Sequence, residues 1–300
     1  MRSLYGFRND GEMVINMTTK CNQNCLNCPS DEDFIKQDIT KKGLFEFIKE
    51  NYRSDVNVIT LIGGEPTISP HFFKVLKLFS KLKKRINFQI NSNGVMFSYD
   101  SFSKKMYELK KSGLDFNVEF GIYSPNKSIH EKITQLPNSW DKSVKGLKNL
   151  LKYNISCGIR TVSNKINYDS FKYYGDFIRK NNLNNISSFT FIGMDTIGNA
   201  HKNKDKLLLS HINLAPKIEE GIDSLRKEII DEKIEVHLLP KAIFREGYRK
   251  FIVKSGCVGG AFTDNGKLCK KCIYYKECPR LMKSYVQFFG KSEHKPVLDN

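Results

Sequence analysis

The sequence predicts an α/β protein in which parallel strands alternate with helices along the first two-thirds of the chain. Short runs of β-branched and apolar residues mark the strands, and apolar residues at helical spacing mark the segments between them. Alternating strands and helices imply parallel βαβ units. The predicted strands are 12–18, 56–62, 86–91, 116–122, 155–163 and 187–194, and the predicted helices are 40–53, 70–84, 99–112, 141–153 and 169–181.

Local patterns support these elements one by one. The strand at 56–62 is almost entirely β-branched or apolar, whereas the strand at 116–122 alternates polar and apolar side chains. The helix at 70–84 repeats apolar side chains every third or fourth residue. The helix at 99–112 stops before Gly113, which suits a helix C-cap.

The last third of the chain continues with one more helix and a short strand. A helix is predicted at 211–233, with Pro216 near its start where proline is tolerated, and a strand at 234–239. Three hundred residues fit one large domain with a small appendage. We therefore expect a strand–helix domain at 1–235 and a cysteine-rich region at 236–300.

The chain is strongly basic, with a formal net charge of +17. An acidic peptide, a nucleic acid or a phosphorylated substrate would complement this charge. The alternative is that lysine-rich helix faces are simply solvated, which we favour because the lysines are not interleaved with aromatic residues in one tract. Nucleic acid is therefore an unlikely partner.

The sequence shows neither a signal peptide nor a stretch of about twenty apolar residues. A cytoplasmic protein without a membrane partner is expected. Under these conditions clustered cysteines indicate metal binding more than disulfides.

Cys21, Cys25 and Cys28 form a C-x3-C-x2-C pattern. Thiolates at such short spacings hold iron–sulfur clusters, and three of them would leave the fourth iron of a [4Fe–4S] cluster open. A structural zinc site needs four protein ligands, and the next cysteine, Cys157, is far along the chain. Cys157 itself lies in a predicted strand and is interpreted as a small buried hydrophobic residue.

A second motif follows one helix later, where the strand at 56–62 ends in Gly63-Gly64-Glu65-Pro66. The two glycines permit close approach to the backbone. Glu65 places a carboxylate at the end of the strand, and Pro66 fixes the turn.

Together the stretches CNQNCLNC (21–28) and GGEP (63–66) resemble the radical S-adenosylmethionine (SAM) superfamily, in the expected order and separation. The resemblance implies a partial (β/α)6 TIM-like barrel, a [4Fe–4S] cluster on the three cysteines, and SAM chelated to the open iron. It also implies that the GGEP strand end (Gly63, Gly64, Glu65, Pro66) binds the methionyl amino group. A flavodoxin- or ferredoxin-like electron donor is the implied partner.

Further SAM contacts are expected at the carboxyl ends of the strands, where sites in such folds lie. The resemblance implies that Asn91 and Asn93 after the third predicted strand, Ser124 after the fourth and Arg160 in the fifth bind the cofactor. A structural salt bridge is the alternative for Arg160. Asn27 departs from the family, which usually has an aromatic residue before the third cysteine, so its contact with adenine is in doubt, whereas cluster binding is not. The residues that contact the substrate are unknown.

A second set of cysteines lies near the C-terminus: Cys257, Cys269, Cys272 and Cys278. Four thiolates can complete a [4Fe–4S] cluster or a zinc site. The spacing C-x2-C-x5-C resembles the SPASM and Twitch extensions of radical SAM enzymes, which implies one auxiliary [4Fe–4S] cluster.

Several stretches of the middle of the chain resemble the radical SAM maturase of the His-Xaa-Ser peptide system. They are 61–73, 92–98, 121–133, 143–154, 159–162 and 191–203, together with the C-terminal cysteines. The resemblance implies a ribosomally made precursor peptide as substrate, crosslinked or oxidised at a side chain. A Twitch-type small-molecule dehydrogenase and, less readily, a tRNA-modifying enzyme are the alternatives.

Overall fold

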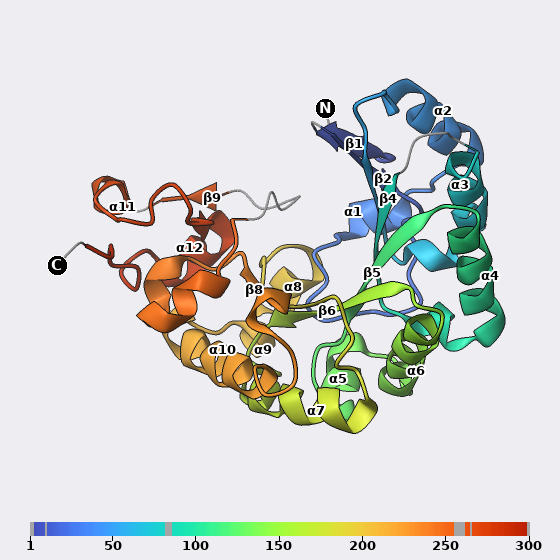
Figure 1. Cartoon of the computed structure of the whole chain (residues 1–300). Coiled ribbons are helices and arrows are strands. Elements are labelled where there is room, and N and C mark those ends of the chain that lie inside the picture. Colours follow the sequence, from blue (N-terminus) through green and yellow to red (C-terminus); the bar gives the residue numbers. More distant parts are fainter. Residues whose placement is uncertain (1–2, 10, 82–85, 255–261, 265, 299–300) are drawn as a thin grey trace. The chain divides into compact units, whose positions relative to one another are not determined.

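The computed structural model describes residues 3–9, 11–81, 86–254, 262–264 and 266–298, and shows an α/β fold (Figure 1). Eight strands of one sheet follow one another in sequence order. They are β1 (Gly6–Asn9), β2 (Glu12–Asn16), β3 (Val58–Ile62), β4 (Asn87–Ser92), β5 (Asp115–Gly121), β6 (Ser156–Ser163), β7 (Ser188–Gly193) and β8 (Ile234–His237). All six predicted strands are present as β2 to β7, and β8 confirms the short strand predicted after them.

The chain divides into two compact units. The first comprises Met1–Asn24, Ser30–Ile122 and Thr134–Ile159, and the second comprises Cys25–Pro29, Tyr123–Ile133 and Arg160–Asn300. The boundary predicted at residue 235 separates a strand–helix domain from a cysteine-rich region, not compact units, and it stays a prediction.

In the first unit, β2, β3, β4 and β5 pair in parallel, while β1 pairs with β2 in antiparallel fashion. Its helices are α1 (Glu32–Lys36), α2 (Lys41–Asn51), α3 (Phe72–Phe79), α4 (Asp100–Lys111) and α6 (Ser139–Lys152), with the 3-10 turns η1 (Pro66–Ile68) and η2 (Val95–Ser98). Figure 1 shows α2, α3 and α4 side by side along these strands.

The two faces of this sheet differ in polarity. On β5, Phe116, Val118 and Phe120 are buried, whereas Asn117 and Glu119 between them are only half-buried. Side chains alternate between the faces of a strand. One face is therefore an apolar core under the helices, and the other carries polar side chains at the centre of the sheet.

In the second unit, β7 and β8 pair in parallel. Its helices are α5 (Lys127–Thr134, whose last residue belongs to the first unit), α7 (Tyr174–Asn181), α8 (Gly198–Lys202), α9 (Lys204–Leu207), α10 (His211–Leu225), α11 (Lys267–Lys270) and α12 (Lys283–Phe289). The 3-10 turns η3 (Tyr168–Tyr173), η4 (Asp231–Lys233), η5 (Lys241–Ile243) and η6 (Glu246–Phe251) and the strands β9 (Phe262–Thr263) and β10 (Leu281–Met282) complete it. No helix among the described residues is both long and apolar enough to cross a bilayer.

Helix α10 is shorter than predicted, because it ends at Leu225 instead of 233. The amides of Glu228 and Ile229 both donate to Leu225 O, at 2.9 Å each, and the chain then enters η4. This turn buries Ile229 and leaves Ile230 exposed. Pro216 lies inside the helix, at its sixth residue.

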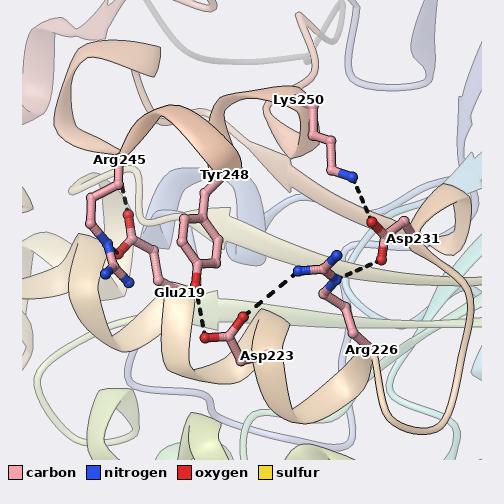
Figure 2. Close-up of polar contacts among 7 residues, drawn as sticks. All are labelled: Glu219, Asp223, Arg226, Asp231, Arg245, Tyr248 and Lys250. Carbon is pink, nitrogen blue, oxygen red and sulfur yellow. Dashed lines mark hydrogen bonds and ion pairs between the residues drawn. The ribbon is translucent and has the colours of Figure 1, made fainter.

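Polar and charged contacts tie α10 and η4 to the segment that follows β8 (Figure 2). The buried carboxylate of Glu219 accepts from the backbone N and the Nε of Arg245, at 2.8 and 2.5 Å. Asp223 accepts from the Tyr248 hydroxyl at 2.7 Å. Asp231 pairs with both Arg226 and Lys250, at 2.8 and 2.6 Å. These pairs hold η6 against α10.

The C-terminal segment is attached at the start of α10. The ring of His211 stacks on Tyr285 with centroids 3.5 Å apart, and its Nδ1 lies 2.9 Å from Nε2 of His294. Both histidines are buried, and burial lowers the pKa of each. The neutral rings thus anchor α12 and the residues after it to the second unit.

Candidate cofactor site

The strand end Gly63–Pro66 packs directly against the backbone that leads into Cys21. Gly64 N donates to Thr18 O at 2.7 Å, and Glu65 N donates to Lys20 O at 2.9 Å. A Cβ on Gly63 would meet Thr18 O at 2.3 Å, and one on Gly64 would meet Lys20 O at 2.1 Å. Both glycines are therefore required by the protein itself, because any side chain would push the two segments apart.

The carboxylate of Glu65 is 1% exposed and accepts four hydrogen bonds. Its Oε1 accepts from the Thr67 amide at 3.1 Å, the Thr67 hydroxyl at 2.5 Å and the Ser92 hydroxyl at 2.8 Å. Its Oε2 accepts from the Asn93 amide at 2.7 Å. Burial raises the pKa of Glu65, and these four donors act in the opposite direction. Glu65 thus joins the carboxyl ends of β3 and β4.

Asn93 connects the GGEP turn to the first cysteine. Its Nδ2 donates to Asn22 Oδ1 at 2.7 Å and lies 3.9 Å from the Cys21 sulfur. Its Oδ1 accepts from the Val95 amide at 3.1 Å, and its backbone oxygen accepts from the Ser143 hydroxyl at 2.6 Å. Every polar group of Asn93 thus has a partner within the chain, and its direct contact with the cofactor stays a prediction.

In the second unit, the segment Cys25–Pro29 is held by backbone contacts with α5 and α8. Leu26 N donates to Ile133 O at 2.8 Å, and Ala200 N donates to Cys28 O at 3.1 Å. Two asparagine side chains of the same region, Asn199 and Asn203, donate to Cys25 O at 3.4 Å and Leu26 O at 3.5 Å. The carbonyls of three residues in this loop are thus bound by one short stretch of sequence.

Asn27, at the centre of this segment, differs from its neighbours. Its side chain is buried, with the residue 4% exposed. Within the described part of the chain, neither its Oδ1 nor its Nδ2 has a hydrogen-bond partner. Asn27, where the sequence differs from the family pattern, is thus also a residue whose buried side chain has no hydrogen-bond partner among the described residues.

The donor set fits an iron–sulfur cluster. Cys21, Cys25 and Cys28 are all reduced thiols, exposed for Cys21 and half-buried for the other two. Accessible thiols at this spacing are what cluster ligation requires. Cys157, in contrast, is fully buried, and burial raises the pKa of its thiol well above the ordinary value. This agrees with its interpretation as a core residue.

The other predicted cofactor residues have partners within the protein. The Ser124 hydroxyl donates to the Ser170 hydroxyl at 2.9 Å and accepts from the Asn126 amide at 3.0 Å. Arg160 is half-buried on β6. The pKa of Glu235 is lowered mainly by a hydrogen bond with His237, and the positive charge of Arg160 lowers it further. Asn91 is half-buried on β4, opposite Glu119 of β5. Their roles toward SAM stay predictions.

Of the distal cysteines, Cys257 lies outside the described residues. Cys269, Cys272 and Cys278 are half-buried reduced thiols on consecutive turns, where Cys272 N donates to Cys269 O at 3.0 Å and Cys278 N to Tyr274 O at 2.9 Å. In the described ranges, no three His, Cys, Asp or Glu side chains form a group that could hold a metal ion, and this applies to Cys21, Cys25 and Cys28 as well as to the distal cysteines. Ligation of the first cluster by those three cysteines therefore stays a prediction. The auxiliary cluster likewise stays a prediction.

Basic side chains surround this cysteine segment. The ammonium of Lys241 lies 3.2 Å from the Glu277 carboxylate and 5.0 Å from the Tyr274 ring. Lys254 Nζ donates to Lys276 O at 2.9 Å, and the Arg280 guanidinium lies 3.7 Å from the Tyr275 ring centroid. Lys241 and Lys254, which follow β8, thus hold the cysteine segment through Glu277 and Lys276.

Sequence reasoning missed two groups of site residues. Thr67 and Ser92 donate to Glu65, although each lies within or next to a motif that was singled out. Ala200 and its two asparagine neighbours bind the cysteine loop, and their stretch at 191–203 was noted only for its resemblance. Thr67 and Ser92 could have been found as polar residues that flank a motif. Ala200 and its asparagine neighbours lie far from any motif in the sequence, so only the fold reveals them.

Several curated proteins are similar to this chain in sequence. A probable GTP 3',8-cyclase of Thermoplasma volcanium is 26% identical, over 99% of this chain and 88% of that protein. A GTP 3',8-cyclase of Clostridium acetobutylicum is also 26% identical, over 70% of this chain and 66% of that protein.

Solved structures show the same fold. Streptococcus suis SuiB bound to its precursor peptide SuiA superposes with a TM-score of 0.56 at 17% identity, over 75% of this chain and 49% of SuiB. The structure of anSMEcpe with bound AdoMet and the Kp18Cys peptide gives a TM-score of 0.53 at 14% identity, over 72% of this chain and 59% of that protein. The chain thus spans about half the length of SuiB.

The family assignment rests on a match that covers more than half of the chain. Residues 15–178 match the radical SAM superfamily. This range includes the three cysteines, the GGEP turn and the strands β3 to β6. The chain belongs to the radical SAM superfamily.

Proposed function

We propose that this protein binds a [4Fe–4S] cluster through Cys21, Cys25 and Cys28 and cleaves SAM with one electron from a flavodoxin- or ferredoxin-like donor. When bound, the cluster supplies that electron, and SAM yields methionine and a 5′-deoxyadenosyl radical that takes a hydrogen atom from the substrate. The family membership and the three reduced thiols of the motif support this function.

The main observation behind the cofactor site is the arrangement of Glu65. A carboxylate offers about four lone-pair sites, and four donors already occupy this one. The remaining acceptors at the strand end are backbone carbonyls, which suit the methionyl ammonium. Glu65 would then hold these carbonyls in place, while Asn93 ties the strand end to Cys21.

The test is anaerobic reconstitution with iron and sulfide, reduction, and measurement of 5′-deoxyadenosine. Cys25→Ala should lose the cluster absorbance and form no 5′-deoxyadenosine. Cys157→Ala, which removes a buried thiol outside the motif, should retain both. Full iron content and SAM cleavage in the Cys25 variant would disprove the proposed cluster ligation.

As substrate we propose a ribosomally made precursor peptide, on the resemblance of several stretches to the peptide maturase. The polar face of the first unit's sheet supports this choice. Gln89 of β4 pairs in register with Asn117 of β5, whose Nδ2 donates to Glu119 Oε1 at 2.7 Å. Side-chain amides both donate and accept, so they can pair with the backbone of an extended peptide.

A nucleoside triphosphate is the second candidate substrate, because relatives that align with nearly the whole chain are named GTP 3',8-cyclases. The net charge of +17 would suit either an acidic leader peptide or a triphosphate. Incubation of the reduced enzyme with SAM and either GTP or a library of synthetic precursor-like peptides separates the two. A peptide-dependent rise in 5′-deoxyadenosine with a mass change of the peptide supports our choice, and a GTP-dependent rise contradicts it.

For the C-terminal region, 236–300, we propose one auxiliary [4Fe–4S] cluster on Cys257, Cys269, Cys272 and Cys278. It would accept the electron of the substrate radical and pass it to an external acceptor, which gives net oxidation of the substrate. The double variant Cys269→Ala/Cys272→Ala should lose about half of the iron, because one of two clusters is gone. It should also stop product formation while SAM cleavage continues. Unchanged turnover would overturn this role, and zinc in place of the lost iron would identify a zinc site instead.

A further inference from the structure

The turns that carry Cys269 and Cys272 present lysines and apolar side chains to solvent. We call this the α11 surface, because it lies on α11 and the turns that follow it (Figure 1). Six exposed side chains define it: Lys267, Leu268, Lys270, Lys271, Ile273 and Lys276. Its two apolar members, Leu268 and Ile273, are 48% and 46% exposed. The surface thus has four positive charges around two apolar side chains.

The end of the chain extends this surface. Ile273 N donates to Val297 O at 3.0 Å, so the last described residues lie beside the turn that carries Ile273. Among them Leu298 is 56% exposed, and Lys295 is exposed as well. A further apolar side chain and a further cation therefore adjoin the α11 surface.

The carboxylates of this region are engaged by other groups. Residues 262–298 contain eight Lys and Arg residues but only three Asp and Glu residues. Asp264 accepts from the Gly266 amide at 2.9 Å, and Glu293 accepts from the His211 amide at 3.1 Å. Glu277 pairs with Lys241 at 3.2 Å. Within the described part of the chain, no carboxylate forms an ion pair with the four lysines of the α11 surface, so their charge is available to a partner.

The neighbouring aromatic rings argue against nucleic acid as that partner. Single strands bind by stacking their bases on accessible aromatic rings. Tyr274 and Tyr275 are half-buried, and cations already cover them. The Lys241 ammonium lies 5.0 Å from the Tyr274 ring centroid, and the Arg280 guanidinium lies 3.7 Å from that of Tyr275. A single strand would therefore find no open ring at this surface.

An extended peptide is also a poor match, because it would need an open strand edge to pair with. The strands of this region, β9 and β10, are two residues long and pair with each other. A small apolar centre within a ring of cations instead suits a folded protein with an acidic face, since opposite charges steer and orient such encounters.

The position of the thiols specifies which kind of acidic protein fits. Cys269 and Cys272 are only half-buried and lie between the lysines of the α11 surface. A protein bound there comes close to both sulfurs. Contacts between electron-transfer proteins bury little area and depend on complementary charge. The α11 surface has both properties.

We propose that the α11 surface docks an acidic one-electron carrier protein. The inference rests on the proposed function, since it names the external acceptor of the C-terminal region. The substrate gives a hydrogen atom to the 5′-deoxyadenosyl radical, then loses one electron and releases a proton to solvent. The oxidised carrier gains that one electron and leaves in its reduced form.

The experiment measures binding of oxidised flavodoxin, an acidic one-electron carrier, to the reconstituted protein by surface plasmon resonance. Lys270→Gln/Lys271→Gln should bind flavodoxin about 10-fold more weakly than wild type at low ionic strength, and added salt should reduce this difference. Ile273→Ser should weaken binding by about 3-fold at low and at high salt, because it removes apolar contact area. Cytochrome c, a basic one-electron carrier, should not bind to the wild-type protein.

Lys74→Gln/Lys104→Gln is the matched control, because it removes the same net charge from exposed positions of α3 and α4. It should bind flavodoxin as wild type does. The iron content of each variant is measured in parallel. If Lys270→Gln/Lys271→Gln loses iron, Lys267→Gln/Lys276→Gln takes its place, since it leaves the residues between the two cysteines unchanged, and the same loss of binding is expected.

Electron transfer is measured in a Cys25→Ala background, which lacks the first cluster under the proposed function. The protein is reduced, freed of reductant and mixed with oxidised flavodoxin in a stopped-flow instrument. The flavin semiquinone should form about 10-fold more slowly when Lys270→Gln/Lys271→Gln is added, at equal iron content.

The outcomes separate this inference from the proposed function. Equal affinity of wild type and both lysine variants for flavodoxin would show that the inference is wrong while the clusters stand. Tighter binding of a synthetic acidic peptide or of tRNA, in competition with flavodoxin for the same lysines, would also overturn it. Iron in wild type but none in Cys25→Ala would remove the auxiliary cluster and this inference with it. Wild-type protein that retains no iron at all would contradict the proposed function itself.

Discussion

Glu65 and Asn27 belong to the two motifs that define the candidate site, and both side chains are buried, but their surroundings are opposite. Glu65 accepts four hydrogen bonds from its own chain. Asn27 makes none with the described residues through its side chain. The carboxylate of the GGEP turn is thus satisfied by the fold itself, whereas the amide in the cysteine loop has no partner among the described residues.

The strongest test of this contrast is to remove the satisfied group. Glu65→Leu leaves four buried donors without an acceptor, and we expect the free energy of unfolding of the cluster-free protein to fall by about 4 kcal/mol. Urea denaturation followed by circular dichroism measures this loss. Glu46→Leu, on the exposed side of α2, should change stability by less than about 0.5 kcal/mol. Equal stability of the two variants would refute the central role of Glu65.

Asn93 tests whether the link between the strand end and Cys21 matters for the cluster. Asn93→Ala removes the contacts with Asn22, Val95 and the Cys21 sulfur, and should cost about 2 kcal/mol of stability. Iron retention after gel filtration should fall as well, since the Cys21 segment loses its support. Asn87→Ala, at the exposed start of β4, is the control. Normal iron retention in Asn93→Ala would show that the contact between the GGEP strand end and the Cys21 segment does not support the cluster.

His130 offers a test by pH. Its Nδ1 accepts from the Tyr123 amide at 3.2 Å, and burial lowers its pKa from 6.5 to about 4. Between these pH values the unfolded chain binds a proton that the folded chain does not, so stability decreases as pH falls. From pH 7 to 5.5 the contribution of this residue should drop by about 1 kcal/mol. His130→Gln should flatten this part of the stability profile, and an unchanged slope would show that His130 is not responsible.

The smallest effect is expected at Glu219, a buried carboxylate whose partner can reach water. Arg245 is 72% exposed at its side chain, so its guanidinium stays hydrated when the ion pair is lost. Glu219→Gln keeps an acceptor for the Arg245 amide and should cost only about 0.5 kcal/mol. Added salt screens the ion pair in the wild-type protein, so it should reduce the difference in stability between the wild type and Glu219→Gln. A loss as large as that at Glu65 would mean that burial of the carboxylate, and not hydration of its partner, sets the cost.

Much of the fold followed from the sequence because the strands are apolar and their helices are amphipathic. All six strands were predicted, and so were five of the seven α-helices described between β2 and β7, apart from their ends. Helices α1 and α5 were missed, and the first part of the helix predicted at 169–181 is the 3-10 turn η3. Strand β1 was missed, although Asp10-Gly11 before β2 is a common hairpin signal. The C-terminal limit of α10 could not be predicted, because the apolar pattern continues through Ile229 and Ile230 while the backbone turns.

The candidate site was predictable only in its motifs. Cys21, Cys25, Cys28 and the GGEP turn are recognisable because their residue types and spacing are rare. The partners of these residues come from distant segments, such as Ser92 for Glu65 and Ala200 for Cys28, and periodicity contains no information about them. Asn27 stood out in the sequence by its polarity, but only the structure shows that its amide is unpaired among the described residues.

The attachment of the cysteine loop to α8 also has a consequence for biosynthesis. Asn199 donates to Cys25 across a separation of 174 residues. A ribosome adds about 5–20 residues per second, so the loop emerges on the order of ten seconds before the segment that shapes it. During that interval the thiols are exposed on an unfinished chain. Cluster delivery should therefore be productive only after the second unit has been synthesised, and truncated chains ending before α8 should fail to retain iron.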